Sequence, residues 1–177
     1  MGRQLVFGYG SLPAEEAGVA CCLRDHRRGW DVAMDNREAI PGYKYYLDPH
    51  TGERPAVYVA YLSISPAPGE RVNGFAFIVG DEELALLDQR ERNYERRDVT
   101  ELLETNLGGR VWAYVGTAAA RKRLAIGRER GTAVVSRRYL ERVRDAFDAR
   151  DLLDDFDATT DPHDLPLRTL LRRDIRP

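Results

Sequence analysis

The stretch Gln4-Leu-Val-Phe-Gly-Tyr-Gly-Ser-Leu12 decides how this chain is interpreted, because it joins a short apolar run directly to two glycines. The apolar half, Gln4–Gly8, predicts a buried strand, and the glycines predict a tight loop after it. Glycine permits positive φ and a close approach of the backbone to a ligand. Successive amides in such a loop can form an anion-binding concavity, to which Ser11 adds a hydroxyl group. The sequence therefore predicts a ligand-binding loop at the end of the first strand.

Other interpretations of this loop fit less well. A dinucleotide fingerprint requires a third glycine where Pro13 stands, and a phosphate loop requires Gly-Lys-Ser/Thr, which this loop lacks. Gly-Tyr-Gly-Ser-Leu is also not the Gly-x-Ser-x-Gly elbow of hydrolases, although Ser11 as a nucleophile stays open. A simple strand-to-turn glycine pair is the remaining alternative.

The middle of the chain contains two strong strand signals. Ala56–Ile64 and Val72–Val79 are rich in β-branched and aromatic residues. The connector between them is short and holds Pro66, Pro68 and Gly69, so we expect the two strands to pair antiparallel.

The remaining elements complete the prediction of fold class. Further strands are expected at Trp30–Met34, Glu95–Glu104 and Val111–Val115, helices at Ala14–Cys22, Asp81–Asn93, Ala118–Ile126 and Ser136–Arg150, and a surface loop at Pro41–Arg54. Strands followed by helices indicate an α+β fold, with a curved or closed sheet and helices packed outside. A length of 177 residues suits one domain, placed at 1–153, with a C-terminal extension at 154–177 that packs on it or is partly ordered.

Composition argues against several classes of protein. The 27 basic and 29 acidic residues give a net charge of -2, without the basic excess of a nucleic-acid binder. No signal-peptide pattern and no bilayer-length apolar stretch occur, so a cytoplasmic protein that engages no membrane is expected. The histidines are scattered and the acidic cluster after residue 153 lacks the pattern of a calcium loop, so no metal or other cofactor is predicted. The sequence does not indicate an oligomeric state.

One carboxylate stands out in the helix expected at Asp81–Asn93. Leu84, Leu87 and Glu91 are spaced i, i+3 and i+7, which places them on one helical face. A carboxylate on a core-facing stripe has to be paired, protonated or functional. The functional interpretation is a general base, because burial favours proton uptake by a carboxyl group. An ion pair with one of the many arginines is the competing structural interpretation.

Several of these motifs, taken in order, resemble the γ-glutamyl cyclotransferase-like family. The resemblance is carried by Phe7-Gly-Tyr-Gly-Ser-Leu12, Val72-Asn-Gly-Phe-Ala-Phe77, Leu87-Asp-Gln-Arg-Glu91 with Tyr94 and Val99 behind it, and Val111-Trp-Ala-Tyr114. It covers roughly the first two-thirds of the chain. It implies a small mixed-sheet barrel in which a γ-glutamyl amide is cyclised to 5-oxoproline, with release of an amine or amino acid.

The resemblance also implies roles for individual residues. Glu91 matches the family's acid/base, and substrate contacts are expected from Tyr9, Gly10, Ser11, Leu12, Tyr94 and Tyr114. Pro13-Ala14 departs from the aromatic residue of the glutathione-specific branch, so the γ-glutamyl compound itself is open. A non-catalytic binding module of the same fold, or an amide hydrolase using the same cavity, are the alternatives.

A tyrosine cluster, Tyr43-Lys-Tyr-Tyr46, falls within the expected surface loop. Exposed aromatic residues of this kind contact a partner, cover a pocket or pack in the ordinary way. The sequence alone does not decide among these three.

Overall fold

The structure is a computed structural model in which residues 2–12 and 18–176 are described. The helix expected at Ala14–Cys22 lies partly outside these residues. Its described part from Val19 onward is a strand, because Val19 to Cys22 pair in register with β4, and Cys21 faces the core.

Strands dominate the chain, and the helices lie mostly in its later half. The strands are β1 (Gln4–Gly8), β2 (Val19–Asp35), β3 (Lys44–Leu47), β4 (Tyr58–Val79), β5 (Tyr94–Asp98), β6 (Arg110–Gly116), β7 (Ala133–Ser136), β8 (Leu167–Arg168) and β9 (Leu171–Asp174). The helices are α1 (Asp81–Arg90), the 3-10 helix η2 (Thr100–Leu102), α2 (Ala118–Glu129), α3 (Arg137–Asp148) and α4 (Leu153–Ala158). The strands expected at Gln4–Gly8, Trp30–Met34 and Val111–Val115, and the helices expected at Ala118–Ile126 and Ser136–Arg150, are confirmed.

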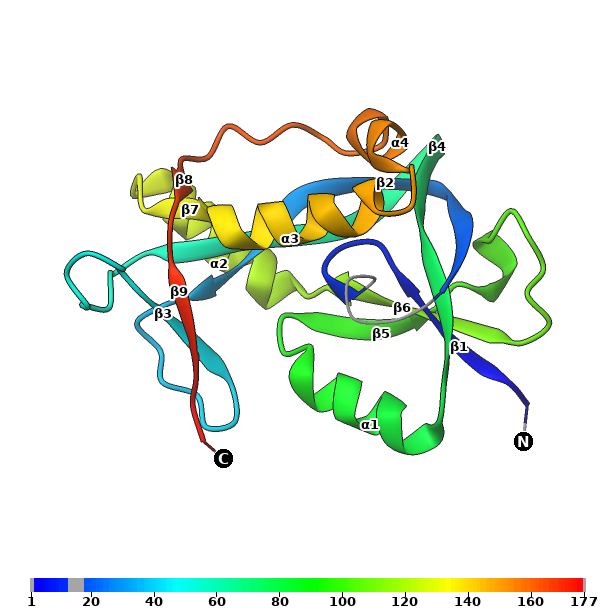
Figure 1. Ribbon diagram of the computed structural model, residues 1–177, viewed down its shortest axis with the longest axis horizontal. Helices are drawn as coiled ribbons and strands as arrows, with labels where there is room; N and C mark the ends of the chain where they lie inside the picture. The colour runs from blue at the N-terminus through cyan, green and yellow to red at the C-terminus, as the bar shows by residue number, and fades with distance from the viewer. Residues whose placement is uncertain (1, 13–17, 177) are drawn as a thin grey trace.

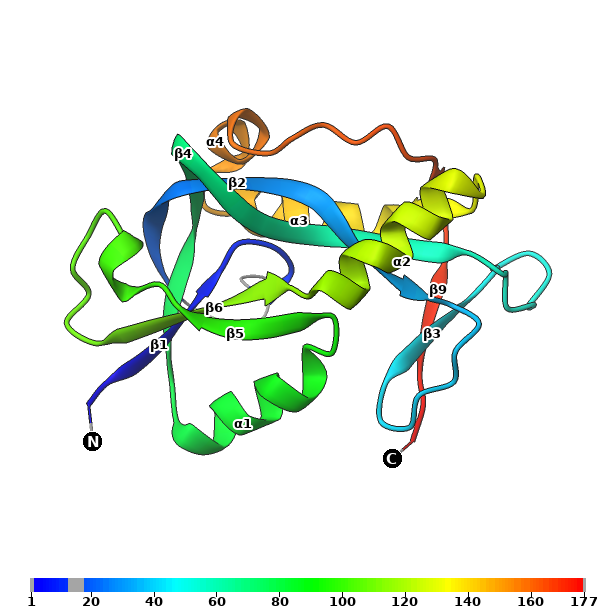
Figure 2. The ribbon, with the colours of Figure 1, turned by 180° about the vertical axis from the view of Figure 1, so that it is seen from behind.

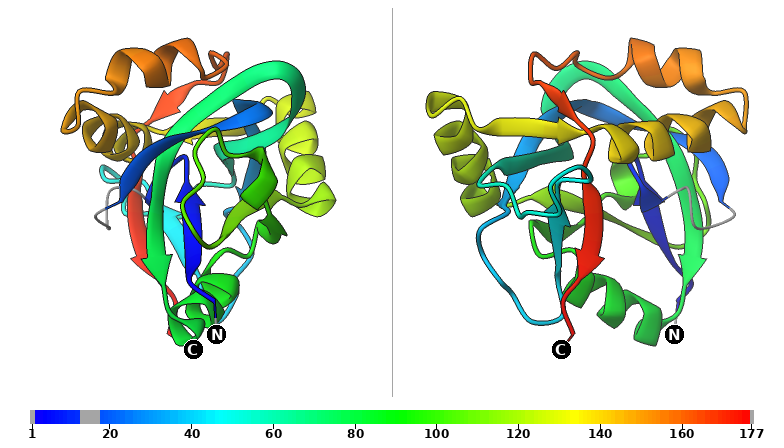
Figure 3. Two further views of the ribbon diagram at one scale, coloured as in Figure 1. Left: turned by 90° about the vertical axis from the view of Figure 1, so that its right-hand side faces the viewer. Right: turned by 60° about the vertical axis from the view of Figure 1, so that its left-hand side comes forward.

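A seven-stranded mixed sheet, in the order β5-β6-β1-β4-β7-β8 with β2 also paired to β4, forms most of the fold. The sheet curls on itself, as the arch of β4 in Figure 3 shows. The end of β6 meets β2 and β4, where a Cβ on Gly116 would lie 2.3 Å from Val32 Cγ1 and 2.8 Å from Ser63 Oγ. Only glycine permits this approach. The predicted α+β class with a curved mixed sheet is confirmed.

The strands expected at Ala56–Ile64 and Val72–Val79 are two parts of the single strand β4, so the predicted hairpin between them is wrong. Along one edge, β4 pairs antiparallel with the long strand β2. Along the other edge it pairs with β1 near its end and with β7 near its start. Both edges are therefore occupied, and the two parts have no free edge with which to pair with each other.

A shared bend accommodates the residues that were expected to break this strand. Pro66 pairs with His26 next to a register shift in β2, which is where proline is tolerated within a sheet. Asp25 has a φ of 55°, and its carboxylate accepts a hydrogen bond from the Gly69 amide at 2.9 Å. The turn residues thus bend two paired strands together instead of ending one of them.

Helices cover the curled sheet from opposite sides. Helix α3 crosses the front of the β2–β4 ribbon in Figure 1, whereas α2 crosses it in the rear view of Figure 2. Helix α1 lies at the far end of the molecule from α4 (Figure 1). Among the described residues, no helix is long and apolar enough to span a bilayer.

One predicted strand boundary needs correction, whereas the predicted start of a helix is confirmed. The strand expected at Glu95–Glu104 ends at Asp98, because the Asp98 carboxylate accepts hydrogen bonds from the amide and hydroxyl of Thr100 and turns the chain. Helix α1 begins at Asp81 as expected; Gly80 is its cap, and the Glu83 carboxylate accepts a hydrogen bond from the Gly80 amide at 2.7 Å.

The expected surface loop at Pro41–Arg54 contains a strand, β3, which pairs antiparallel with β9 near the C-terminus. In this register Lys44 lies opposite Asp174, and Tyr46 lies opposite Arg172. The preceding strand, β8, pairs parallel with β7. The segment 154–177 is therefore joined to the rest of the molecule at two strand edges, which Figure 3 shows in its right-hand view.

A fully buried arginine, Arg28, ties three parts of the fold together. Its guanidinium donates hydrogen bonds of 2.7 to 3.1 Å to six acceptors: Tyr9 O, Asn73 O, Asn73 Oδ1, Phe156 O, Thr159 Oγ1 and Thr160 Oγ1. The group also lies over the ring of Phe156, 4.0 Å from its centroid. No carboxylate of a described residue is within ion-pair distance, so neutral dipoles and an aromatic face solvate the charge.

Replacing Arg28 with methionine is expected to destabilise the protein by about 3 kcal/mol or more, because several buried carbonyl groups lose their donor at once. Urea unfolding followed by circular dichroism measures the change. Arg24→Met, on an exposed part of the same strand, is the control and is expected to change stability by less than about 1 kcal/mol. Equal unfolding midpoints for the two variants would contradict the role given to Arg28.

Candidate active site

A narrow pocket behind the loop that follows β1 brings the sequence-predicted site residues together. Its lining comprises Tyr9, Gly10, Ser11, Leu12, Glu91, Tyr94 and Tyr114, together with Phe7, Leu62 and Tyr139. These residues come from the first loop, the segment after α1, the strands β4 to β6 and the helix α3. The fold therefore gathers groups that lie far apart in the sequence.

Glu91 lies directly after the last residue of α1. The helix expected to reach Asn93 ends at Arg90, and Glu91 has φ of -85° and ψ of 54°, which is not helical. Its amide still donates to the Leu87 carbonyl at 2.9 Å as in a helix, so the side chain projects from the last turn along the predicted stripe of Leu84 and Leu87. The side chain is only 18% exposed, and its Oε1 lies 3.4 Å from Arg90 Nε. Burial of the carboxylate is thus combined with an ion pair to a neighbouring residue.

The position at the end of α1 has an electrostatic consequence. The last carbonyl groups of a helix carry partial negative charge, which favours a cation beside them. The carboxylate of Glu91 adds a full charge at the same place. This corner of the pocket consequently suits a ligand ammonium group.

The glycine loop supplies backbone amides, although not by the route expected from its glycines. Gly8 lies within β1, and Gly10 does not take a positive φ. Close packing is the reason for Gly10, because a Cβ there would lie 3.3 Å from the hydroxyl oxygen of Tyr139. The amides of Gly10, Ser11 and Leu12 donate no hydrogen bond to another described residue. They are available to an anionic or carbonyl oxygen of a ligand.

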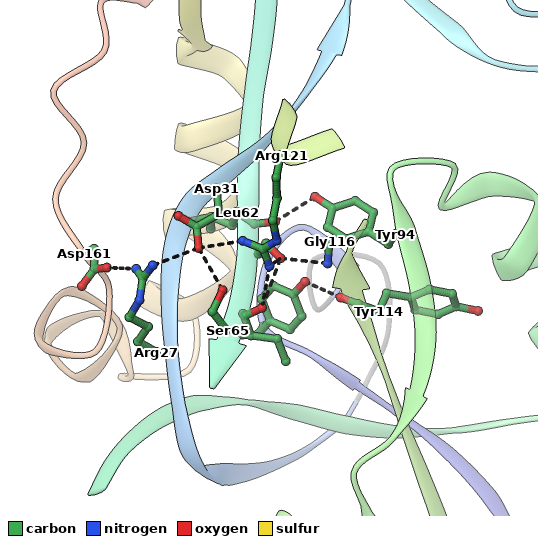
Figure 4. A network of polar contacts seen from close by, with 12 residues as sticks. Arg27, Asp31, Leu62, Ser65, Tyr94, Tyr114, Gly116, Arg121 and Asp161 are labelled. Atoms are coloured by element: carbon green, nitrogen blue, oxygen red, sulfur yellow. Dashed lines mark hydrogen bonds and ion pairs between the residues drawn. The ribbon is translucent and has the colours of Figure 1, made fainter. Parts of the chain in front are cut away.

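A polar network lies beneath the loop (Figure 4). The Tyr9 hydroxyl donates a hydrogen bond to the carbonyl of Tyr114. Arg121 reaches the Asp31 carboxylate at 3.2 Å and donates to Ser63 Oγ at 3.4 Å. Burial raises the pKa of Tyr9 well above its usual value, so its phenol stays protonated. Tyr9 therefore forms a fixed wall of the pocket.

The two other predicted tyrosines use their hydroxyl groups within the protein. Tyr94 donates to the Leu62 carbonyl at 2.8 Å, and burial holds its pKa well above the ordinary range. Tyr114 donates to Asp88 Oδ1 at 2.8 Å and points away from the network in Figure 4. Both rings line the pocket, but their hydroxyl groups already have acceptors.

A larger outer cavity of about 500 Å³ adjoins the narrow pocket and shares Ser11, Glu91, Tyr94 and Tyr139 with it. Its volume falls in the range of small-molecule sites. Three residues of the tyrosine cluster, Tyr43, Lys44 and Tyr46, line this cavity. Of the three roles considered for the cluster, the structure shows that it borders the cavity.

Sequence reasoning missed several residues of this cavity. Tyr139 packs edge-on against Trp30 and Tyr61, with ring centroids 5.9 and 5.0 Å apart. Its sequence pattern is that of an ordinary core residue of α3, so it did not indicate a site. Arg172 lies on β9, which no local pattern predicts. Ser136 is the N-cap of α3, but its side chain forms no cap hydrogen bond, and the residue lines the cavity. Among the described residues, no three His, Cys, Asp or Glu side chains are grouped to hold a metal ion.

Lys44 carries a perturbed charge in the outer cavity. Its ammonium lies over the ring of Tyr61, 4.5 Å from the centroid, and 5.3 Å from that of Tyr43. Burial lowers the pKa of Lys44 to about 8, with nearby Arg172 lowering it further and Glu91 opposing the shift. The cavity thus disfavours an unaccompanied positive charge at this position.

Comparison with known proteins agrees with this architecture. A family model described as gamma-glutamyl cyclotransferase, AIG2-like, matches residues 6–131. The chain belongs to this family. The match includes the first loop and Glu91 and ends before β7, α3 and β9. No curated protein sequence matches.

Solved structures show the same fold. One titled gamma-glutamyl cyclotransferase has a TM-score of 0.55 and 14% identity, covering 94% of this chain and 93% of that one. A human protein described as uncharacterized has a TM-score of 0.54 and 15% identity, covering 93% and 92%. A yeast γ-glutamyl cyclotransferase described as specific to glutathione has a TM-score of 0.54 and 15% identity, covering 93% and 100%.

The contact between Gly10 and Tyr139 gives a prediction about the loop. Gly10→Ala is expected to destabilise the protein by about 1 kcal/mol, because its methyl group crowds the Tyr139 hydroxyl. In Tyr139→Phe, which removes that hydroxyl, the same alanine is expected to cost less. A double-mutant cycle from urea unfolding measures the coupling. Strictly additive effects would show that the two residues do not constrain each other.

The depressed pKa of Lys44 gives a prediction about pH. Between pH 8 and 10.5 the unfolded lysine keeps a proton that the folded one has lost, so its contribution to stability rises with pH. Lys44→Met is therefore expected to be more stable than the parent at pH 7, and the difference is expected to shrink by about 2 kcal/mol by pH 9.5. Urea unfolding at both pH values measures it. Lys122→Met, on an exposed face of α2, is the control, and an equal shift there would contradict the assignment.

Proposed function

We propose that the protein cyclises γ-glutamyl amides to 5-oxoproline and releases the amine. The observation that carries the proposal is that the half-buried Glu91 carboxylate shares one narrow pocket with the unengaged amides of Gly10, Ser11 and Leu12. This cyclisation requires two kinds of group, namely a proton acceptor and hydrogen-bond donors for the oxyanion that forms. Family membership supports the same reaction.

Glu91 acts as the acid and base. The α-ammonium of the substrate has to lose a proton before its nitrogen can attack, and a carboxylate within hydrogen-bonding reach accepts it. The carboxylate and the negative end of α1 both attract the ammonium group to this corner. Binding thereby places the proton donor of the substrate beside its acceptor.

The loop amides stabilise the charge that develops next. The free amine attacks the γ-carbonyl carbon, a five-membered ring closes, and the carbonyl oxygen becomes an oxyanion. Fixed amide donors stabilise such an oxygen without reorganising. The attacking nitrogen becomes positively charged as the ring closes, and it gives its surplus proton to water. As the bond from this carbon to the leaving nitrogen breaks, Glu91 returns its proton to that nitrogen. The amine departs neutral, and Glu91 is again a carboxylate.

Orientation supplies a further part of the rate. Amine and carbonyl belong to one molecule, so the protein has only to hold the glutamyl chain in a folded conformation. Rings of Tyr9, Tyr94 and Tyr139 line the pocket, and their hydroxyl groups are kept protonated by burial. These rigid walls restrict the glutamyl chain without competing for the proton.

A panel of γ-glutamyl compounds tests the proposal, with 5-oxoproline measured by liquid chromatography and mass spectrometry. Glu91→Gln is expected to lower kcat/KM by at least about 100-fold, because general acid-base catalysis is lost. Glu82→Gln, at an exposed position on α1, is the matched control and is expected to keep full activity. Thermal unfolding of both variants verifies that they fold.

Three results would count against this function. Release of free glutamate would indicate an amide hydrolase using the same cavity. Tight binding without any product would indicate a binding module. Unchanged turnover in Glu91→Gln would remove the proposed acid and base.

A further inference from the structure

The outer part of the cavity is basic. Five basic side chains line it, namely Lys44, Arg90, Arg138, Arg142 and Arg172, against the two acidic side chains of Glu91 and Asp174. Each acidic group already lies near a base, since Glu91 is 3.4 Å from Arg90 and Asp174 is 2.8 Å from Arg172. Positive charge therefore predominates on the described walls of a cavity that also contains the candidate catalytic group.

The β3–β9 ribbon explains why these charges point inward. Alternate residues of a strand share a face, so Lys44 and Tyr46 of β3 project to one side. Their partners across the ladder are Asp174 and Arg172, which project to the same side. All four line the cavity, whereas the intervening Arg173 does not. The register of β9 thus selects which arginine of an adjacent pair enters the site.

The positive charges also lie close enough to affect one another. Arg172 and Arg90 both contribute to lowering the pKa of Lys44. Like charges gathered in a partly desolvated place are unfavourable, and an anion between them offsets that cost. The aromatic rings beneath Lys44 fix its ammonium, so that it cannot simply swing into solvent.

A buried hydroxyl group provides a second, independent indication of a ligand. Ser136 is 1% exposed and lines the same cavity, and its Oγ has no hydrogen-bond partner among the described residues. Buried polar groups are nearly always satisfied, so an unpaired one in the wall of a cavity indicates an absent partner. A hydroxyl group can donate to an anionic oxygen.

We propose that Lys44, Ser136, Arg138 and Arg172 form a subsite that binds an anionic group on the amine half of the substrate. The inference deepens the proposed function and depends on it for the position of the glutamyl half. Ser11 and Glu91 line both the narrow pocket and the outer cavity. With the γ-carbonyl beside these two residues and the glutamyl chain in the narrow pocket, the leaving nitrogen faces the outer cavity. The favoured substrates are γ-glutamyl compounds whose amine carries a carboxylate or a phosphate-like group.

Four matched substrates test this selectivity. They are γ-glutamylglycine, its neutral amide γ-glutamylglycinamide, the cationic γ-glutamyl-ethylenediamine, and γ-glutamyl-aminomethylphosphonate. We expect kcat/KM for γ-glutamylglycine to exceed that for its amide by roughly tenfold or more, with the cationic compound the poorest. The order of the carboxylate and the phosphonate decides which anion the subsite prefers. Equal rates for all four would overturn the proposal.

Neighbouring arginines on β9 provide matched variants. Arg172→Met is expected to abolish the preference for γ-glutamylglycine over its amide, mainly through a higher KM for γ-glutamylglycine. Arg173→Met removes the same charge from the other face of the strand and is expected to keep the preference. Arg172→Lys is expected to restore part of it, which a purely structural role would not require. An equal loss in both methionine variants would overturn the subsite.

Binding measurements separate failure of the subsite from failure of the proposed reaction. Calorimetry with the Glu91→Gln protein compares γ-glutamylglycine with γ-glutamylglycinamide without turnover. The subsite is supported if the Glu91→Gln protein binds γ-glutamylglycine more tightly than the amide, and if the double variant with Arg172→Met loses this difference. This result supports the subsite even if no 5-oxoproline forms in any assay. If 5-oxoproline is produced but neither the rate nor the binding favours the anionic substrate, the proposed reaction is supported and the subsite is rejected.

Discussion

The buried charge of Arg28 is the constraint on which the rest of the structure depends. A guanidinium without a carboxylate partner can be held in a core only if nearly all its N–H groups find acceptors. The acceptors are carbonyl, amide and hydroxyl oxygens of the first loop, of β4, and of α4 with the two threonines that follow it. Satisfying one charge therefore fixes the relative positions of three segments, including the backbone at Tyr9 that begins the candidate substrate loop.

The candidate site combines two ends of secondary structure. β1 ends in a loop whose Gly10, Ser11 and Leu12 amides have no partner among the described residues, and α1 is followed directly by Glu91, whose carboxylate is largely buried. Strand and helix ends are the places where backbone polar groups lack regular partners. Placing two such ends on one pocket gives both an electropositive set of donors and an electronegative corner, which matches a substrate that carries an ammonium group and a carbonyl group.

Local patterns in the sequence predicted the elements whose residues pack by local rules. Examples are the strand before the glycine loop, helix α3, and the largely buried side chain of Glu91. For Glu91 the predicted helix was too long, because α1 ends at Arg90, but the Glu91 amide still donates to the Leu87 carbonyl and keeps the side chain on the predicted face. Glycines in the loop were likewise expected to supply unusual dihedral angles, whereas Gly10 supplies space for Tyr139.

The rest of the structure depends on pairing between distant segments. Nothing in Ala56–Val79 alone indicates that both of its halves pair with β2, since proline and glycine between them are typical of a turn. β3 and β9 are four-residue strands about 130 residues apart, and they pair with each other in a separate two-stranded sheet. Lys44 and Arg172 were therefore not predictable as neighbours, because their proximity is a property of that ladder.

The residues that line the cavity come from two portions of the chain, and this origin has an evolutionary consequence. Glu91 and the glycine loop lie within the part of the chain that matches the family, whereas Ser136, Arg138 and Arg172 lie after residue 131, where that match ends. Under the proposed roles, bond making is encoded in one portion of the gene and discrimination among amines largely in another. Mutations can then accumulate in the later portion and retune which metabolites are accepted, without disturbing the inherited chemistry.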